Sequence, residues 1–227
     1  MGTVLDNPVW HSLCDAHLSW ATGTEHVKWY SPDVAPFIAV AEPGTIVDGD
    51  PLAASRLQSA YIVGVAPDVL PDGWRVEATF PVLQMIYAGE PVAALDRPFV
   101  ELSTAHRPKM FELAGIAFPD FFRARTGELG TYFGVFADER LVAMAGERMA
   151  FGDFREISGV CTHPDHAGHG YASHLSRVLL ERHRLRGWRS FLHVSASNTK
   201  AAKLYEKLGF ERRTVLTMWK VSRAAVA

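Results

Sequence analysis

Residues 161–175 read CTHPDHAGHGYASHL, and this stretch decides how the second half of the chain folds. It brings histidines, an aspartate and a cysteine close together, which is typical of a metal site. It also places Gly168 and Gly170 directly before an amphipathic run, which is typical of a phosphate-binding loop at the start of a helix. The two interpretations predict different chemistry, and the surrounding sequence has to distinguish them.

The metal interpretation rests on side chains that zinc accepts as ligands, namely those of Cys161, His163, Asp165, His166 and His169. Their spacing lacks the paired two-plus-two pattern of zinc sites. A strand would point residues 161 and 163 to one face, so all the ligands would have to converge on one short loop. The chain contains 10 histidines, so clustering by chance is expected. We therefore expect no metal at this position.

The two glycines favour the phosphate interpretation. The first N–H groups of a helix have no partner inside the helix and lie at the positive end of its dipole. Glycine lacks a Cβ atom, so the backbone can approach a ligand closely. The stretch is neither a P-loop nor the three-glycine dinucleotide fingerprint. We expect a helix from about Gly170 to Arg186, ended by Gly187, whose first turn binds an anion.

The composition is that of an ordinary globular protein. The 227 residues are 48% hydrophobic and 21% charged, which is enough to bury a core. A net charge of −2 gives no electrostatic reason to expect a nucleic acid or an anionic membrane as partner. Cys14 and Cys161 are the two cysteines, and the N-terminus lacks a signal-peptide pattern. We expect no disulfide framework, no membrane span and a cytoplasmic location.

A proline- and glycine-containing break at residues 88–98, AGEPVAALDRP, divides the chain. Before it, the pattern is weak. A loose helical pattern covers residues 8–20, and short runs at 36–42, 59–67 and 74–81 predict strands. No catalytic constellation is apparent in this half.

After the break, the pattern is clear and predicts a mixed sheet with helices on both sides, an α/β fold of the α+β kind. Pro108 suits the first turn of a helix capped by Ser103 or Thr104. The predicted strands lie at 99–103, 131–137, 141–151, 154–163, 190–195 and 213–221, and the predicted helices at 105–118, 170–186 and 198–210.

Two separated runs carry a family resemblance. VCTHPDHAGHGYASHL (160–175) followed by LHVSASNTKAAKLYEKLGF (192–210) resembles the GNAT superfamily of acyl-CoA-dependent N-acetyltransferases, and within it the glycine N-acyltransferase-like branch. The family loop reads Gln/Arg-x-x-Gly-x-Gly/Ala. This chain matches the glycine and the closing small residue, but Ala167 replaces the opening Gln/Arg and removes one side-chain donor.

The resemblance covers residues 98–222 and implies a GNAT-like N-acetyltransferase domain at 98–227. It does not extend to residues 1–97. Two-part members of the superfamily suggest that this segment is a smaller N-terminal domain, a degenerate GNAT-like first half whose role the sequence does not reveal.

The resemblance also implies the residues that hold acetyl-CoA, the expected acyl donor. The strand before the loop pairs its backbone with the pantetheine arm, and Gly159 suits the bulge that splays this strand from the next. Asn198 lies near the pantetheine and is also the natural N-cap of the following helix. The implied coenzyme-binding residues are Val160, Cys161, Thr162, Gly168, His169, Gly170, Tyr171, Ala172, Ser173 and Asn198.

For catalysis, the family position makes Tyr205 the general acid that protonates the departing thiolate, and the alternative is a packing role for its ring. An ammonium has no lone pair, so a base is also expected. Glu156 occupies the position of the basic glutamate in histone-acetylating members, and Glu147 is the second choice. The alternative for either glutamate is an ion pair with Arg148 or Arg155. Cys161 is expected to be buried and inert.

The sequence thus predicts an enzyme that transfers an acetyl group from acetyl-CoA to a primary amine by direct attack in a ternary complex. The alternative is a non-catalytic coenzyme A-binding regulatory module, which the Ala167 substitution keeps open. A metal-dependent hydrolase ranks third. We expect a small-molecule amine as the partner and neither nucleic acid nor a membrane. The sequence carries no code for the acceptor, for acyl length or for the oligomeric state.

Overall fold

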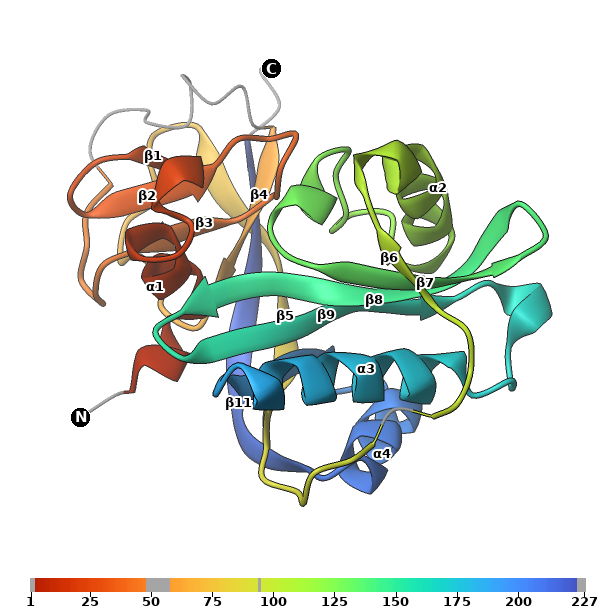
Figure 1. Ribbon diagram of the computed structural model, residues 1–227. Helices are drawn as coiled ribbons and strands as arrows, with labels where there is room; N and C mark the ends of the chain where they lie inside the picture. Colours follow the sequence, from red (N-terminus) through yellow and green to blue (C-terminus); the bar gives the residue numbers. More distant parts are fainter. Residues whose placement is uncertain (1–2, 48–57, 94, 224–227) are drawn as a thin grey trace.

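The computed structural model describes residues 3–47, 58–93 and 95–223 (Figure 1). Four α-helices and eleven β-strands form within these ranges. The helices are α1 (Pro8–Cys14), α2 (Arg107–Ala117), α3 (Tyr171–Leu185) and α4 (Thr199–Lys207). The strands are β1 (Ala21–Gly23), β2 (Val27–Tyr30), β3 (Ile38–Val40), β4 (Ser59–Val63), β5 (Trp74–Tyr87), β6 (Val100–Leu102), β7 (Tyr132–Ala137), β8 (Arg140–Phe151), β9 (Phe154–Thr162), β10 (Arg189–Ser195) and β11 (Phe210–Arg223).

Eight strands form one mixed sheet in the order β4-β11-β5-β10-β9-β8-β7-β6, and β1, β2 and β3 form a small antiparallel sheet. Within the large sheet β9 and β10 run parallel, and the other described neighbours are antiparallel. The meander β7–β8–β9 confirms the three consecutive strands that the sequence predicted. The mixed α/β sheet is therefore also confirmed.

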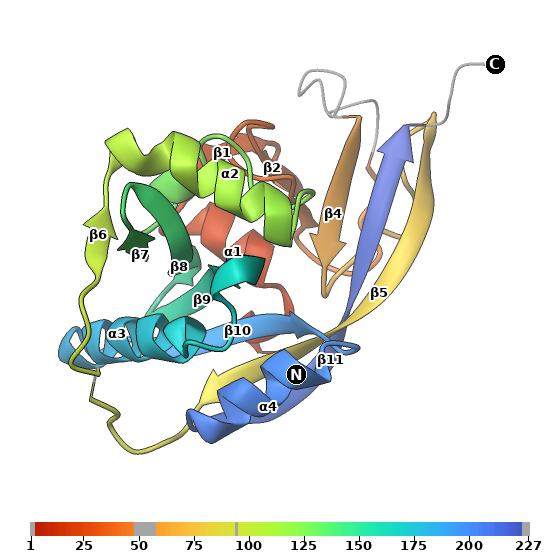
Figure 2. The same cartoon turned by 90° about the vertical axis from the view of Figure 1, so that its right-hand side faces the viewer.

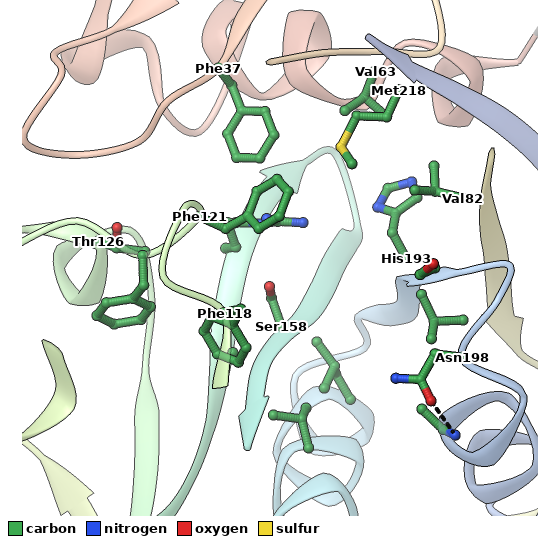
Figure 3. Close-up of a pocket in the computed structure, with 18 of the residues that line it drawn as sticks. Phe37, Val63, Val82, Phe118, Phe121, Thr126, Ser158, His193, Asn198 and Met218 are labelled. Atoms are coloured by element: carbon green, nitrogen blue, oxygen red, sulfur yellow. Dashed lines mark hydrogen bonds between the residues drawn. The ribbon is translucent and has the colours of Figure 1, made fainter. Parts of the chain in front are cut away.

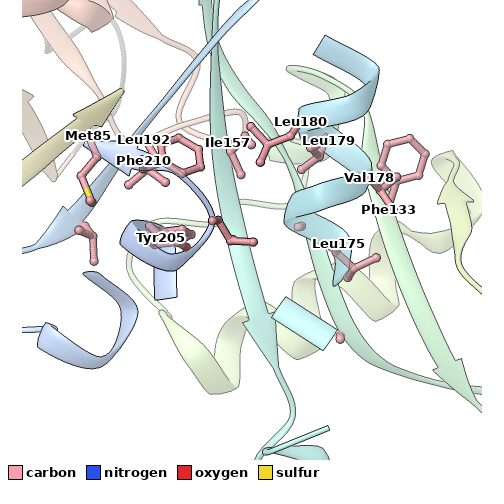
Figure 4. Close-up of a cluster of buried hydrophobic side chains, with 14 of the residues drawn as sticks. Met85, Phe133, Ile157, Leu175, Val178, Leu179, Leu180, Leu192, Tyr205 and Phe210 are labelled. Carbon is pink, nitrogen blue, oxygen red and sulfur yellow. The ribbon is translucent and has the colours of Figure 1, made fainter. Parts of the chain in front are cut away.

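Helices cover both faces of this sheet. Figure 1 shows α3 crossing one side of β7–β9 and α2 crossing the other. Figure 4 shows Leu175, Val178 and Leu179 of α3 packed towards Phe133 and Ile157 of the sheet. Burial of these apolar side chains is the main force that fixes the helix on the sheet. The 15-residue α3 agrees with the predicted helix, and Gly187 follows it in a left-handed conformation.

Helix α2 begins where proline allows it. A short 3₁₀ turn, Thr104–His106, precedes it, Ser103 is the N-cap of that turn, and Pro108 is the second residue of α2. Proline is tolerated there because first-turn N–H groups have no helical partner in any case. The predicted start of this helix is confirmed within two residues.

The first 97 residues do not stand apart from the rest of the chain. Strand β5, longer than the predicted 74–81, lies between β10 and β11, and β4 pairs with the outer side of β11. The boundary expected at residue 97 therefore runs through a continuous sheet. The expected degenerate GNAT-like domain is not confirmed, since the remaining elements of this half are α1 and the three-stranded sheet.

None of the helices in the described part of the chain combines the length and the apolar character needed to cross a bilayer.

Candidate active site

The centre of the site is the point where β9 and β10 separate. The two strands pair over Phe154–Glu156 and Arg189–Phe191, and beyond this both line a cavity. Gly159 has a positive φ of 62°, and the register of β9 against β8 shifts close to it. The bulge predicted at Gly159 is thus confirmed. The separation leaves one backbone edge of β9 facing the cavity, as an added extended chain would require.

The loop before α3 has the backbone geometry of an anion site. Gly168 and Gly170 have φ values of 83° and 75°, a left-handed conformation that glycine adopts without strain. A Cβ atom built on Gly168 would have no heavy atom within 4 Å, so the backbone there is open. The residues predicted to take a pyrophosphate, from Gly168 to Ser173, form this loop and the first turn of α3.

An arginine from outside the loop motif reaches the same place. The Nη1 atom of Arg97 donates a hydrogen bond of 2.6 Å to the carbonyl oxygen of His169. The same atom lies 3.8 Å from the position that a Cβ atom on Gly170 would occupy. The missing donor at Ala167 was apparent from the sequence, but this guanidinium was not, because Arg97 lies before β6 and far in sequence from His169.

The loop histidines follow one another in a row, with 6.2 Å between the ring centroids of His163 and His166 and 6.4 Å between those of His166 and His169. His163 contacts Arg140, with 2.6 Å between its Nε2 and the guanidinium nitrogen, whereas the His169 ring stacks on Tyr171. Cys161 is buried in an apolar cluster, and burial raises the pKa of its thiol to about 12. Across the described residues no group of three or more metal-binding side chains comes together.

A cavity of about 280 Å³ opens at the β9–β10 separation (Figure 3). The wall formed by β9, the end of β10 and α4 includes small and polar residues, namely Ser158, Gly159, Ser195, Asn198 and Tyr205. The far wall of the cavity is apolar, and Figure 3 shows its phenylalanines facing His193 across the cavity. Its apolar residues include Phe37, Phe118, Phe121 and Phe122, and Val63, Val82 and Met218 add further apolar lining, with Val82 beside His193 in Figure 3.

Tyr205 lines the cavity from α4, as the family position predicts. Its ring packs edge-on against Phe210 at 5.8 Å between ring centroids, so the packing role is also real. Burial raises the pKa of its phenol to about 12. The phenol is therefore protonated at neutral pH, which is the state a general acid needs.

Asn198 also lines the cavity, and its side-chain oxygen accepts a hydrogen bond of 3.1 Å from the Ala201 N–H. The predicted N-cap is thus confirmed. Of the strand residues expected to meet the pantetheine, Val160 lines the cavity, whereas Cys161 points into the apolar cluster. This alternation is the normal period of a strand.

Glu156 is completely buried and its carboxylate is fully engaged. Arg148 binds it with two hydrogen bonds of 2.9 and 2.7 Å, and the Nδ1 atom of His193 donates a third of 2.8 Å. Burial raises the pKa of this carboxyl, but the charge and hydrogen bonds of Arg148 and the hydrogen bond from His193 outweigh burial and lower the pKa to about 2. This environment does not suit the general base that the sequence analysis expected. The alternative, an ion pair with Arg148, is the observed state.

His193 lines the cavity, and its hydrogen bonds define its tautomer. Arg213 donates to the Oε1 atom of Gln84, so the Gln84 amide nitrogen faces His193. That nitrogen donates to the Nε2 atom of His193 at 2.9 Å, and the Nδ1–H of His193 in turn donates to Glu156. The lone pair of Nε2 is therefore occupied. The signal in the sequence was one polar residue in the otherwise apolar strand FLHV.

Glu147 points to the opposite face of the sheet. Its Oε1 atom lies 3.2 Å from Nε of Arg182 and 3.1 Å from Nε2 of His183, both on α3. Its Oε2 atom accepts a hydrogen bond from the Thr131 N–H at 3.1 Å. Burial raises the pKa of the carboxyl, and these partners outweigh it and lower the pKa. Glu147 anchors α3 to the sheet and does not line the cavity that Tyr205 lines.

Comparisons with known proteins agree with this geometry. Residues 95–210 match the Acetyltransferase (GNAT) family. A crystal structure from Novosphingobium aromaticivorans, assigned to the GNAT family of acetyltransferases, is 34% identical, with a TM-score of 0.86 over 99% of this chain and 100% of that one. A search of curated proteins found no match.

Two more distant structures share the fold alone. A GCN5-related N-acetyltransferase from Kribbella flavida is 16% identical, with a TM-score of 0.55 over 95% of this chain and 96% of that one. A GCN5-related N-acetyltransferase-like protein from Streptococcus suis is 17% identical, with a TM-score of 0.52 over 85% of this chain and 82% of that one. The family match over half the chain and the full-length relative agree: this protein belongs to the GNAT family of acetyltransferases.

Proposed function

We propose that the chain is an N-acetyltransferase that transfers an acetyl group from acetyl-CoA to a primary amine by direct attack in a ternary complex. The observation that carries the proposal is the open edge of β9 next to Tyr205, with the glycine loop at the start of α3 further along the same strand. Acetyl-CoA supplies the activated thioester.

The residues present fit a coenzyme of this kind. The separated edge of β9 offers unpaired backbone groups to an extended amide-containing arm. The left-handed glycines leave room for phosphate oxygens to meet the free N–H groups of α3, and the helix dipole favours their negative charge. Arg97 adds a cation where Ala167 provides none.

Tyr205 is the proposed general acid. It holds its proton at neutral pH and gives it to the sulfur of the leaving group. Glu156 and Arg148 are proposed to act through His193, whose ring they hold in place. In this proposal Glu156 orients the His193 ring and does not itself transfer a proton.

The alternative is a non-catalytic coenzyme A-binding module, for which the one specific observation is Ala167 in place of Gln/Arg. The glycine N-acyltransferase-like branch is a further proposal, and it implies glycine as acceptor. The carboxylate of glycine needs a cationic partner, but the guanidinium that lines the cavity, that of Arg148, is already paired with Glu156.

The test is thermal unfolding with acetyl-CoA, with coenzyme A and with EDTA, followed by thiol release from acetyl-CoA over a panel of amines. Ligand at a hundredfold its dissociation constant adds about 2.7 kcal/mol of stability, which raises the midpoint by roughly 2–4 °C per kcal/mol. We expect stabilisation by both coenzymes, no effect of EDTA, and amine-dependent thiol release. Stabilisation without turnover of any amine would favour the non-catalytic module, and no stabilisation would contradict both.

A further inference from the structure

The charges of the residues that line the cavity bear on the class of acceptor. These charges are unusual for a site that binds an amine, because no aspartate or glutamate is among the described residues lining it. Arg148 is the guanidinium in the wall, and Glu156 behind it neutralises its charge. An ammonium entering this space would lose its hydration without meeting a carboxylate, which is strongly unfavourable.

Among the described residues in and around the cavity, the carboxylates and the imidazole already have hydrogen-bond partners. Glu156 is held by Arg148 and His193, and the lone pair of His193 Nε2 is occupied by Gln84. Glu147 is on the other face of the sheet. A protonated alkylamine therefore has no group here to take its proton before attack.

The far wall has the chemistry of a binding site for a flat apolar body. Phe37 and Phe121 stack with 6.5 Å between ring centroids and an interplanar angle of 23°, and Phe118 and Phe122 continue the wall. Met218 of β11 also lines the cavity and lies beside Val63 (Figure 3). Aromatic rings pack favourably in such surroundings, and a thioether adapts to their shape.

We propose that the acceptor is an aromatic amine whose nitrogen is uncharged at neutral pH, with its ring against Phe37, Phe118 and Phe121 and its nitrogen towards Tyr205. This inference rests on the proposed function and names its substrate class. It also gives residues 1–97 a role, since Phe37, Val63 and Val82 of that segment form part of the wall.

The reaction balances with the groups present. The amine nitrogen forms a bond to the thioester carbon, and the carbon–sulfur bond breaks. The sulfur receives the phenolic proton of Tyr205, and the nitrogen, acidic once it has acquired a positive charge, returns a proton to the phenolate. Because burial raises the pKa of this phenol to about 12, the phenolate is basic enough to accept it.

The test compares p-toluidine with benzylamine, which are isomers of the same formula and differ in whether the amine is charged at neutral pH. With acetyl-CoA at pH 7, we expect kcat/KM for p-toluidine to exceed that for benzylamine by about 100-fold or more, because the ammonium must first be deprotonated. Binding of p-toluidine to the coenzyme A complex, measured by calorimetry, gives a readout that is independent of turnover.

Variants test the wall. Phe121→Ala and Phe118→Ala should each raise KM for p-toluidine about tenfold and leave KM for acetyl-CoA unchanged. The matched control is Phe111→Ala, which removes an exposed phenylalanine of α2 outside the cavity and should change neither value. Because either substitution could destabilise the protein, the change in KM is measured in both variants.

The outcomes separate the two levels of the proposal. Stabilisation by acetyl-CoA together with a preference for benzylamine, glycine or a polyamine would overturn the acceptor class and leave the acetyltransferase intact. Efficient transfer from benzoyl-CoA to glycine would show that the wall holds the acyl group, and would also overturn the inference. Failure to bind acetyl-CoA at all would contradict the proposed function and this inference together.

Discussion

The proposed coenzyme side and the proposed acceptor side of the cavity are built in different ways. The coenzyme side comes from β9, the glycine loop and the start of α3, which follow one another between residues 154 and 185, with Asn198 and Tyr205 shortly after. The proposed acceptor side is assembled from residues far apart in sequence, namely Phe37, Val63, Val82, Phe118, Phe121, Phe122 and Met218. One side is therefore local in sequence and the other is long-range. This difference explains why the sequence supports a proposal for the donor much more readily than one for the acceptor.

Substitution of Tyr205 should have the largest effect on catalysis. Tyr205→Phe keeps the ring and removes the proton, so we expect kcat to fall by roughly 100-fold or more while the affinity for acetyl-CoA stays the same. Tyr87→Phe is the matched control, because Tyr87 also packs edge-on against Phe210 but is not among the residues that line the cavity. Full activity in Tyr205→Phe would leave Tyr205 with a packing role only, because this variant keeps the ring and removes the hydroxyl.

The dependence of kcat on pH in the wild-type protein tests the same role of Tyr205. Its pKa is raised to about 12, so the phenol stays protonated as the pH rises from 7 to 10. We expect no decrease of kcat for p-toluidine across this range. A decrease with a midpoint near pH 8 or 9 would show that a different acid protonates the thiolate.

The glycine loop should have the next largest effect, on the coenzyme side alone. Gly168→Val places a branched side chain at a φ of 83° in the space where phosphate oxygens are proposed to lie. We expect the dissociation constant for acetyl-CoA to rise by roughly 10-fold or more, since backbone donors are displaced. Gly152→Val, at a φ of 49° in the turn between β8 and β9, is the control for backbone strain. It should lower stability and leave coenzyme affinity intact.

Arg97 should have a smaller effect of the same kind. Arg97→Ala removes one cation near the loop, and we expect a rise of about 5-fold in the dissociation constant for coenzyme A, with weaker salt dependence. Arg186→Ala, at the other end of α3, is the control. Equal affinities in the two variants would mean that Arg97 only fastens the chain to His169.

The last prediction concerns stability and not activity, through the contact of His17 with the carbonyl of Leu129 in the segment before β7. His17 is buried, and burial lowers its pKa to about 4, opposed by the hydrogen bond to the Leu129 carbonyl. A histidine with a depressed folded-state pKa stabilises the fold above its unfolded pKa of about 6.5, and this contribution is lost as the pH falls towards 4. We expect a loss of up to about 3 kcal/mol from this group.

Thermal unfolding between pH 7 and pH 4 measures this contribution. His17→Gln should flatten the dependence of the unfolding midpoint on pH, whereas His26→Gln, at an exposed position, should leave it unchanged. Parallel curves for the wild type and His17→Gln would contradict the assignment.

The contrast between local and long-range contacts also explains which features could be predicted from the sequence. The meander β7–β9, helix α3 and the Asn198 cap depend on local periodicity and turn chemistry, and they were predicted closely. The insertion of β5 between β10 and β11 depends on pairing across more than 100 residues, which periodicity does not encode. Glu156 was placed correctly in its strand. Its bidentate hydrogen bonds with Arg148 and its contact with His193 depend on side chains that meet only in the folded sheet.

Amide hydrogen exchange with and without coenzyme A tests the central claim most directly, because it reports where the coenzyme binds. The account predicts slower exchange at residues 158–162 of β9 and at residues 168–173 of the loop and first turn of α3, with little change in α2 or β4. Slower exchange confined to other segments, or none at residues 158–162, would contradict the assignment of the β9–β10 separation as the coenzyme site.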